Sequence, residues 1–256
     1  MKKLIKTIAL VLALTFVLLG FAGCSGTDVS VSGIQARGEL VMLTNAAFPP
    51  FEYVEDGKEV GVDIDIANEI AKDLGVTLKV VNMDFDPIVD YIKSGKGDIG
   101  AAGMTVTEER KESVDFSIEY VKSKQYVITM KDNTDIKVDN LDGLTIGVQT
   151  GTTGDTVYAS DEEYVKAKEV KRYKNALEAA SDLKLGRVDC VVIDELPAKK
   201  IVEENPELKC EESVWEEEWY AIAVQKGNTT LLEAVNNTLQ RLMDEGKIDE
   251  YIVNHS

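Results

Sequence analysis

Apolar positions along the chain follow two alternating spacings, which together predict its secondary structure. Residues 39–45 (ELVMLTN) and 77–83 (TLKVVNM) are short apolar runs that are typical of strands. Between them, apolar residues recur every four positions over 63–75, which predicts a helix that ends at a glycine. We expect Asp63 to cap the start of this helix rather than to bind a ligand.

The same alternation continues along the chain. It predicts helices over 86–97 and 175–187, strands over 98–105, 144–149, 168–173 and 189–194, and a glycine- and threonine-rich loop over 151–160 that enters a helix. Strands that alternate with helices indicate parallel sheets and therefore an α/β fold.

A short internal repeat divides the chain into two similar α/β lobes. Residues 92–98 (IKSGKGD) and 183–189 (LKLGRVD) share a lysine, a glycine and an aspartate at the same spacing, where a helix ends and a strand begins. Five residues after each repeat, Gly103 and Asp194 occupy equivalent strand ends. Ligands of open α/β sheets bind at such ends, so we expect a binding site in a cleft between the lobes.

The composition disfavours several classes of function. With 256 residues, 44% of them hydrophobic, the chain is long enough to bury a proper core. Its formal net charge of −18 argues against nucleic acid as a partner. The single histidine, His255, stands at what we expect to be a ragged C-terminus, which argues against histidine catalysis. The sequence has no metal-binding cluster and no dinucleotide fingerprint, so we expect neither a metal nor a cofactor.

The N-terminal segment has the pattern of a targeting signal followed by a tether. A basic start and an apolar run predict a cleaved signal peptide over residues 1–23. Residues 21–24 (FAGC) resemble the lipobox of bacterial lipoproteins, which implies that Cys24 becomes a lipidated N-terminus held in the membrane. Residues 24–33 are then the lipidated end and a flexible tether. A retained transmembrane anchor and a plain signal peptide stay open as alternatives.

Two further cysteines, Cys190 and Cys210, have two open interpretations. An exported chain permits a disulfide between them. Cys190, however, lies in an apolar run that predicts a buried strand, where cysteine often serves only as a small hydrophobic side chain.

Arg110 is one of only five arginines in this acidic chain, and it follows the strand end of the first lobe. Together with the hydroxyl of Thr105, its guanidinium suits a carboxylate, and the glycine turn at 149–155 adds a helix start that favours anions. Asp194, at the equivalent strand end, suits a cation. These two groups facing each other describe a zwitterionic α-amino acid. Taken singly, Arg110 could be a solvated helix residue, the glycine turn an ordinary turn and Asp194 a helix cap.

Several stretches together resemble the bacterial extracellular solute-binding proteins of polar amino-acid ABC importers, the family that contains the glutamine- and histidine-binding proteins. The resemblance covers about residues 36–252 and rests on TNAAFPPFEY, GVDIDIANEIAKDLG, MDFDPIVDYIKSGKGDIGAAGMTVTEERKESVDFS, IGVQTGTTGD and DCVVIDELPA. It implies a two-lobe, type II periplasmic-binding-protein fold. It also implies a monomeric receptor outside the cytoplasm that delivers an amino acid to a membrane permease.

By the same resemblance, the chain crosses between the lobes twice, as paired strands at 124–130 and 219–225. Lobe 1 then comprises residues 34–127 and 224–256, and lobe 2 comprises residues 128–223. A ligand held by both lobes stabilises the closed arrangement, so the implied mechanism is hinge closure.

The resemblance also implies roles for individual residues. Arg110 and Thr105, with the backbone N–H of Thr153, hold the α-carboxylate, whereas Asp194 and the carbonyl of Gly103 hold the ammonium. The full set of expected ligand-binding residues is Asn45, Phe48, Phe85, Gly103, Met104, Thr105, Arg110, Gln149, Thr152, Thr153 and Asp194. The two phenylalanines flank the ligand by resemblance, although on pattern alone each would be a core residue.

Two neutral amides are expected at the side-chain end of the ligand. Asn45 occupies the position at which family members that bind basic ligands have an aspartate, and Gln149 stands at the position that resembles a lysine of the glutamine binders. Amides hydrogen-bond a neutral polar side chain and gain nothing from charge, which favours glutamine or cystine over arginine, lysine or histidine. Asp84 and Glu52 lie nearby in sequence and could supply a carboxylate to a basic ligand.

Two other classes of function remain as alternatives. One is an enzyme on the same fold, similar to prephenate or arogenate dehydratase, because carboxylate catalysis is compatible with the sequence. The other is a ligand-sensing module, although the chain carries no recognisable signalling domain. Turnover of a substrate would favour the enzyme, and an unchanged, stoichiometric ligand would favour the receptor.

Overall fold

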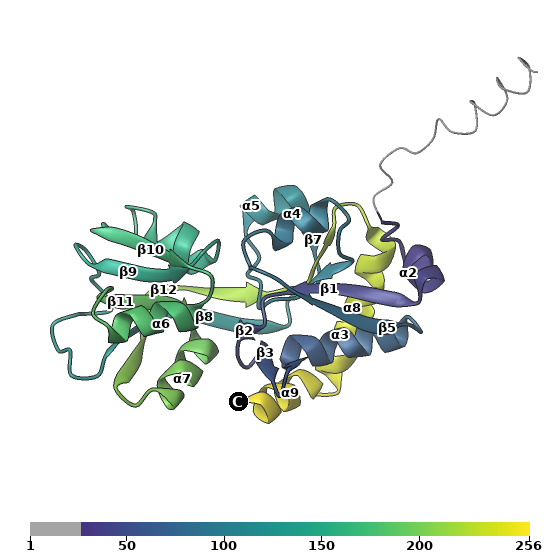
Figure 1. Ribbon diagram of the computed structural model, residues 1–256. Helices are drawn as coiled ribbons and strands as arrows, with labels where there is room; N and C mark the ends of the chain where they lie inside the picture. The colour runs from purple at the N-terminus through teal and green to yellow at the C-terminus, as the bar shows by residue number, and fades with distance from the viewer. Residues whose placement is uncertain (1–26) are drawn as a thin grey trace, which may run out of the picture.

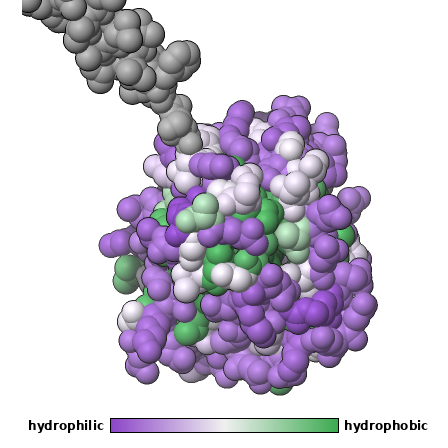
Figure 2. Space-filling view, turned by 90° about the vertical axis from the view of Figure 1, so that its right-hand side faces the viewer, coloured by the Kyte–Doolittle hydropathy of each residue, from purple (hydrophilic) through white to green (hydrophobic). Residues whose placement is uncertain are grey.

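The computed structural model describes residues 27–256, which form two α/β lobes side by side (Figure 1). The expected signal peptide and Cys24 lie outside the described residues. Within residues 27–256, no helix combines the length and the apolar character that crossing a membrane requires. Figure 2 shows that hydrophilic side chains cover most of the end face of the first lobe, as the acidic composition leads one to expect.

The first lobe is built on a five-stranded sheet in the order β5-β1-β6-β13-β7. Its elements are α2 (Val31–Arg37), β1 (Glu39–Thr44), α3 (Val62–Asp73), β5 (Thr77–Asn82), α4 (Ile88–Lys93), β6 (Ile99–Gly100), α5 (Glu108–Ser113), β7 (Val114–Phe116), β13 (Ala223–Gln225), α8 (Thr229–Asp244) and α9 (Lys247–His255). β1 runs parallel to both β5 and β6, whereas β13 is antiparallel to β6 and β7. Helices cover both faces of the sheet, with α4 and α5 above it and α3 and α9 below it in Figure 1.

A small antiparallel sheet extends the first lobe toward the second. It consists of β2 (Ala47–Phe48), β3 (Glu52–Glu55) and β4 (Lys58–Val60). The predicted helix over 63–75 is confirmed as α3, whose apolar side chains at Ile66 and Ile70 are fully buried in the core. α8 and α9 pack against α3, so the C-terminal helices return to the first lobe as expected.

The second lobe has a five-stranded sheet in the order β10-β9-β11-β8-β12. Its elements are β8 (Val121–Met130), β9 (Thr145–Gln149), the π-helix η1 (Gly154–Ala159), β10 (Glu169–Tyr173), α6 (Ala176–Lys184), β11 (Cys190–Asp194), α7 (Glu195–Glu204) and β12 (Leu208–Tyr220). β9 runs parallel to β10 and β11, whereas β8 is antiparallel to β11 and β12. The loop expected to enter a helix over 151–160 therefore leads into a π-helix.

The two lobes are joined by two short segments. One connects β7 to β8 through residues 117–120, and the other connects β12 to β13 through residues 221–222. The expected lobe boundaries at 127/128 and 223/224 fall inside β8 and β13. Because each of these strands pairs within a single sheet, we propose that the hinge lies at the two connecting segments instead.

Asp63 does not cap α3, contrary to the prediction. Gly61 occupies the N-cap position, and Asp63 lies in the first turn with a fully buried side chain. Its carboxylate accepts hydrogen bonds from the N–H of Gly103 at 2.9 Å and from the hydroxyl of Tyr120 at 2.6 Å. Tertiary partners have therefore replaced the local capping role that the sequence favoured.

Two predicted segments differ in extent from the observed ones. The strand expected over 98–105 is only two residues long, because the chain turns at Gly103, where φ is +52°. At the start of the described chain, residues 31–33, expected in the flexible tether, form the first turn of α2. The side chain of Ser30 accepts a hydrogen bond from the N–H of Gly33 and caps this helix.

The disulfide interpretation for Cys190 and Cys210 is wrong in this structure, since both cysteines are free. Cys190 lies in β11 and Cys210 in β12, and β8 separates these two strands. Two strand spacings amount to roughly 10 Å, whereas bridged cysteines have Cα atoms within about 7 Å. Cys190 is instead a fully buried core side chain.

The C-terminus is not ragged at His255. This residue lies in the last turn of α9, where one ring nitrogen is 3.2 Å from the hydroxyl of Tyr53 and the other is 2.9 Å from a carboxylate oxygen of Asp65. These contacts fasten α9 to β3 and α3 of the first lobe, so the single histidine has a structural environment away from the cleft.

Candidate functional site

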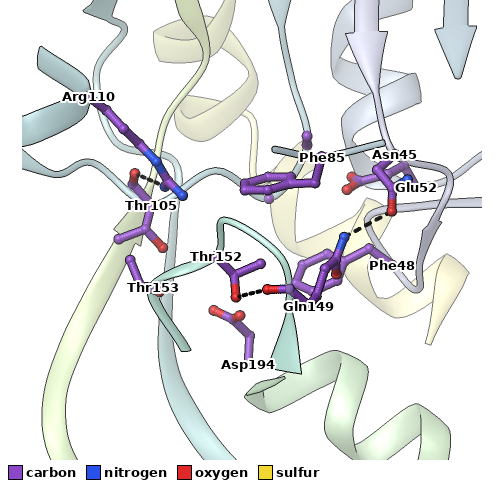
Figure 3. A pocket seen from close by; sticks show the side chains of 12 residues that line it. Asn45, Phe48, Glu52, Phe85, Thr105, Arg110, Gln149, Thr152, Thr153 and Asp194 are labelled. Atoms are coloured by element: carbon purple, nitrogen blue, oxygen red, sulfur yellow. Dashed lines mark hydrogen bonds between the residues drawn. The ribbon is translucent and has the colours of Figure 1, made fainter. Parts of the chain in front are cut away.

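A cavity between the two lobes brings together most of the expected site residues (Figure 3). The empty space that these residues enclose, open solvent included, is about 300 Å³. It is lined by Asn45, Phe48, Glu52, Phe85, Ala102, Gly103, Thr105, Arg110, Gln149, Thr152, Thr153 and Asp194. Ten of the eleven expected ligand-binding residues therefore lie at one place, and they come from both lobes.

Met104 is the expected residue that does not line the cavity. Its side chain is fully buried in the apolar cluster of the first lobe that also contains Ile88 and Ala223. The backbone around it is strand-like, and the carbonyl of Met104 accepts a hydrogen bond from the N–H of Ala221 at 3.1 Å. Successive side chains in such a segment point to opposite sides, so Thr105 faces the cavity while Met104 faces the core.

Arg110 projects from α5 into the cleft (Figure 3). Its two terminal nitrogens donate to the carbonyl of Thr105 at 2.6 Å and to the carbonyl of Gly151, on the second lobe, at 2.9 Å. The guanidinium also lies 5.3 Å from the ring centre of Phe85. Burial lowers the pKa of Arg110, and the carboxylates of Glu218 and Asp194 oppose this shift. Arg110 is therefore a cleft residue and not a solvated one.

The loop after β9 forms the opposite wall of the cleft. Gln149 donates across the cleft to the side-chain oxygen of Asn45 at 3.0 Å, and Thr152 donates to the carbonyl of Gln149 at 2.9 Å. Gly151 has a φ of +79°, and a Cβ at this position would lie 2.5 Å from a carboxylate oxygen of Asp86 on the first lobe. Only glycine permits this close approach of the two lobes.

Asp194 ends β11 and points into the cavity (Figure 3). It stands at the N-cap position of α7, but its side chain makes no capping bond and instead accepts from the hydroxyl of Tyr220 at 2.8 Å. Burial raises the pKa of Asp194 to about 7, and the nearby charge of Glu218 adds to this shift. A buried carboxylate with this pKa is ready to bind a cation, which would return it to the ionised form.

Glu52 is a cavity residue that was not among the expected site residues. It begins β3 and is fully buried; its carboxyl group lies beside that of Asp63, and no donor within the described chain reaches either of its oxygens. Burial raises the pKa of Glu52 well above its ordinary value, and the charge of the neighbouring Asp63 adds to the effect. A buried polar group without a partner is costly, which points to a ligand group at this position.

The aromatic walls of the cavity also belong to the core. Phe48 and Phe85 are 5% and 8% exposed, so each satisfies the core interpretation while it lines the cavity. A Cβ at Gly103 would lie 2.6 Å from the ring of Phe48. The glycine therefore brings the backbone, including the carbonyl expected to meet an ammonium, directly beside the aromatic wall.

Sequence reasoning treated three acidic residues incompletely. Glu52, the single acid in the stretch FPPFEY, was named as a possible carboxylate but was not placed among the expected site residues, whereas Glu218 is hidden in a run of three glutamates on β12. Asp84, named as a possible carboxylate for the ligand, is exposed and lies 3.9 Å from Lys174 on the second lobe. It does not line the cavity.

The fold and the cleft together define a two-lobe binding protein. Residues 40–255 match the bacterial extracellular solute-binding proteins, family 3, and the chain belongs to this family. The prediction of a solute-binding protein from an amino-acid ABC transporter is thereby confirmed, and the enzyme alternative is excluded.

Relatives with known names and structures support this family and the fold class. A probable histidine-binding protein of Campylobacter jejuni subsp. jejuni serotype O:2 is 31% identical over 253 residues, or 93% of this chain and 96% of that protein. The arginine-bound form of truncated ArgBP from T. maritima has a TM-score of 0.76 and 41% identity over 82% of this chain and 99% of that chain. The substrate-binding protein AbpA from Streptococcus pneumoniae, bound to L-arginine, has a TM-score of 0.81 and 34% identity over 87% of this chain and 96% of that chain.

Proposed function

We propose that this protein binds a basic L-amino acid, with arginine first, and delivers it to the permease of an ABC importer. The observation that carries the proposal is the buried carboxylate of Glu52, which lines the cavity without a partner for either oxygen in the described chain. This proposal replaces the preference for glutamine or cystine, which rested on Asn45 and Gln149 alone. Those two amides bond each other across the cleft.

The charges that line the cavity favour a ligand of net positive charge. Arg110 contributes one positive charge, and Glu52 and Asp194 contribute two carboxylates. An α-carboxylate matched to Arg110 and an α-ammonium matched to Asp194 leave Glu52 for a cationic side chain. The arginine-bound relatives and the histidine-binding relative agree with this assignment.

Glu52→Gln tests the side-chain assignment directly. We expect the affinity for L-arginine to fall about ten- to hundredfold, because a charge-assisted bond to the guanidinium is replaced by a neutral one. The affinity for L-glutamine should change less than about threefold. Calorimetric titrations of wild type, Glu52→Gln and the control Glu55→Gln, an exposed acid on the same strand, measure both effects.

The ligand preference of the wild-type protein can contradict the basic-ligand proposal. If glutamine or cystine binds the wild-type protein tenfold more tightly than arginine in a competition series over all amino acids, the basic-ligand proposal fails. The neutral interpretation through Asn45 and Gln149 then stands. If arginine wins but Glu52→Gln leaves its affinity unchanged, another group holds the guanidinium.

Delivery requires that the lobes open and close, and we propose that they do so about residues 117–120 and 221–222. Contacts that join the lobes across the cleft include those of Arg110 with Gly151, Gln149 with Asn45, and Lys174 with Asp84. A ligand bound by both lobes adds to these contacts only in the closed form and shifts the population toward it.

Saturating L-arginine should therefore make the particle measurably more compact in small-angle X-ray scattering. It should also change tryptophan fluorescence, since Trp215 and Trp219 lie on β12 next to the hinge. Identical scattering curves with and without a tightly bound amino acid would rule out hinge closure.

For the rest of the assembly, we propose a monomer held at the outer face of the membrane by a lipid on Cys24, on the strength of the lipobox-like FAGC sequence.

A further inference from the structure

Glu218 is a buried acid next to the cleft that the proposed ligand contacts do not use. It lies on β12 in the run Glu216–Glu218, and it is the one member of this run whose side chain is buried, at 5% exposed. A single oxygen, Oε2, accepts from the hydroxyl of Thr105 at 2.8 Å, from the hydroxyl of Thr153 at 2.9 Å and from the side-chain amide of Gln125 at 3.2 Å. Three donors on one oxygen satisfy a carboxylate that would otherwise be costly to bury.

The partners of Glu218 come from both lobes. Thr105 precedes α5 of the first lobe, whereas Thr153 precedes η1 of the second lobe, and both residues line the cavity. β12 pairs with β8 in the second lobe, but its end also bonds to the first lobe, where the N–H of Val106 donates to the carbonyl of Trp219 and the N–H of Ala221 donates to the carbonyl of Met104. Glu218 therefore lies at the crossing between the lobes and holds one threonine from each wall of the cleft.

The hydrogen bonds to Glu218 determine whether the two threonine hydroxyls can donate to a ligand or only accept from it. A hydroxyl has one proton and two lone pairs, and the proton of each threonine is donated to Glu218. Toward the cavity, Thr105 can only accept. Its hydroxyl therefore suits the α-ammonium beside Asp194 rather than the α-carboxylate for which the sequence suggested it. The carboxylate is left to Arg110 and backbone N–H groups.

We propose that Glu218 is a positioning residue: it orients the hydroxyl of Thr105 with its lone pairs toward the ligand, and it holds Thr105 and Thr153, one from each wall of the cleft, on a single carboxylate oxygen. The inference rests on the cleft as an amino-acid site, but not on which amino acid is bound, because every amino acid has the same α-groups. Replacing the carboxylate with an amide would put a donor against the hydroxyls and free them to turn.

A double-mutant cycle over Glu218→Gln and Thr105→Val tests the proposal, with L-arginine and L-glutamine as probes in calorimetric titrations. Each single variant should lose about ten- to hundredfold in affinity for the probe that binds wild type. The double variant should bind at most about threefold more weakly than the weaker-binding single variant, because both substitutions remove the same Thr105–Glu218 hydrogen bond. The control Glu217→Gln, an exposed acid paired with Lys122 on the surface, should stay within about twofold.

Three results would overturn the proposal. The first is Glu218→Gln binding within twofold of wild type. The second is losses that multiply in the double variant, which would mean that Glu218 does not act through Thr105. The third is an equal loss of affinity in Thr105→Ser and Thr105→Val, which would exclude a role for the hydroxyl. Thr105→Ser keeps the hydroxyl and should bind within about threefold of wild type. This comparison also serves if Glu218→Gln fails to fold. If wild type prefers glutamine, the basic-ligand proposal fails while the cycle, measured with glutamine, still tests Glu218.

Discussion

Arg110→Ala should lower the affinity for the bound amino acid by roughly two to four orders of magnitude. The guanidinium is the single cation that lines the cavity within the described residues, and Asp194 and Glu52 line it as well. Without Arg110, an α-carboxylate would enter a buried site next to two acids with no opposite charge. The free-energy cost of removing the α-carboxylate from water would then not be offset, as happens when a buried ion pair loses one partner. Calorimetry with L-arginine and L-glutamine measures the effect.

The fold should survive this substitution. Arg110 lies at the surface of the cleft and outside the apolar cores of both lobes, so its removal leaves no cavity inside either core. Arg187→Ala is a matched control, because this arginine also pairs with protein oxygens but is 62% exposed and lies away from the cavity. The control should bind normally. Unchanged affinity in Arg110→Ala would refute the carboxylate assignment, and equal losses in both variants would trace the effect to stability.

The sequence allowed the positions of Arg110 and Asp194 to be predicted because both follow from β-α order. A repeated helix-turn-strand pattern placed Gly103 and Asp194 at equivalent strand ends, and such ends meet at one edge of each sheet. The structure brings Gly103 and Asp194 to one cavity. The same logic failed for Met104 because the direction in which side chains face alternates residue by residue, and the sequence pattern did not show that β6 ends at Gly100 rather than at Thr105.

The acids were harder to predict because burial of a charge is a tertiary property. Asp63, Glu52 and Glu218 are each buried among groups that are distant along the chain, so the residues beside them in the sequence do not reveal their burial. Asp63 is satisfied by Gly103 and Tyr120, about 40 and 57 residues away, and local capping rules cannot anticipate such partners. Consequently the sequence-based ligand preference followed the two amides, although Glu52 had been named beside Asp84 as a possible carboxylate for a basic ligand.

Asp194→Asn should produce a comparable loss of affinity, and the size of that loss should depend on pH. Burial and the charge of Glu218 raise the pKa of Asp194 to about 7, above the ordinary value of 3.8. Below pH 7 the wild-type residue is mostly protonated, and an α-ammonium must displace that proton to bind. Wild-type affinity should therefore rise as the pH increases through about 7 and level off above it. The variant has no such proton to lose.

The thermal stability of the ligand-free protein should change with pH in the opposite direction to the affinity. A carboxyl group whose pKa is raised on folding binds more protons in the folded state than in the unfolded state between about pH 4 and pH 7. Its contribution to stability therefore falls as the pH rises through that window and stays low above it. Asparagine carries no charge, so Asp194→Asn should unfold at a higher temperature than wild type at pH 8.5, with a smaller difference at pH 5.

Calorimetric titrations and thermal unfolding of both proteins at pH 5, 7 and 8.5 measure the two trends together. Burial raises the pKa of Asp63 to about 6 and also raises that of Glu52, but both residues remain in the variant, so the difference between the proteins isolates Asp194. At pH 8.5 we expect the variant to bind roughly a hundredfold or more weakly. At pH 5 the gap should narrow by about tenfold or more, because a protonated Asp194 already lacks the charge that the ammonium needs. A gap in affinity that is the same at pH 5 and pH 8.5 would show that Asp194 does not bind the ammonium as an ionised group.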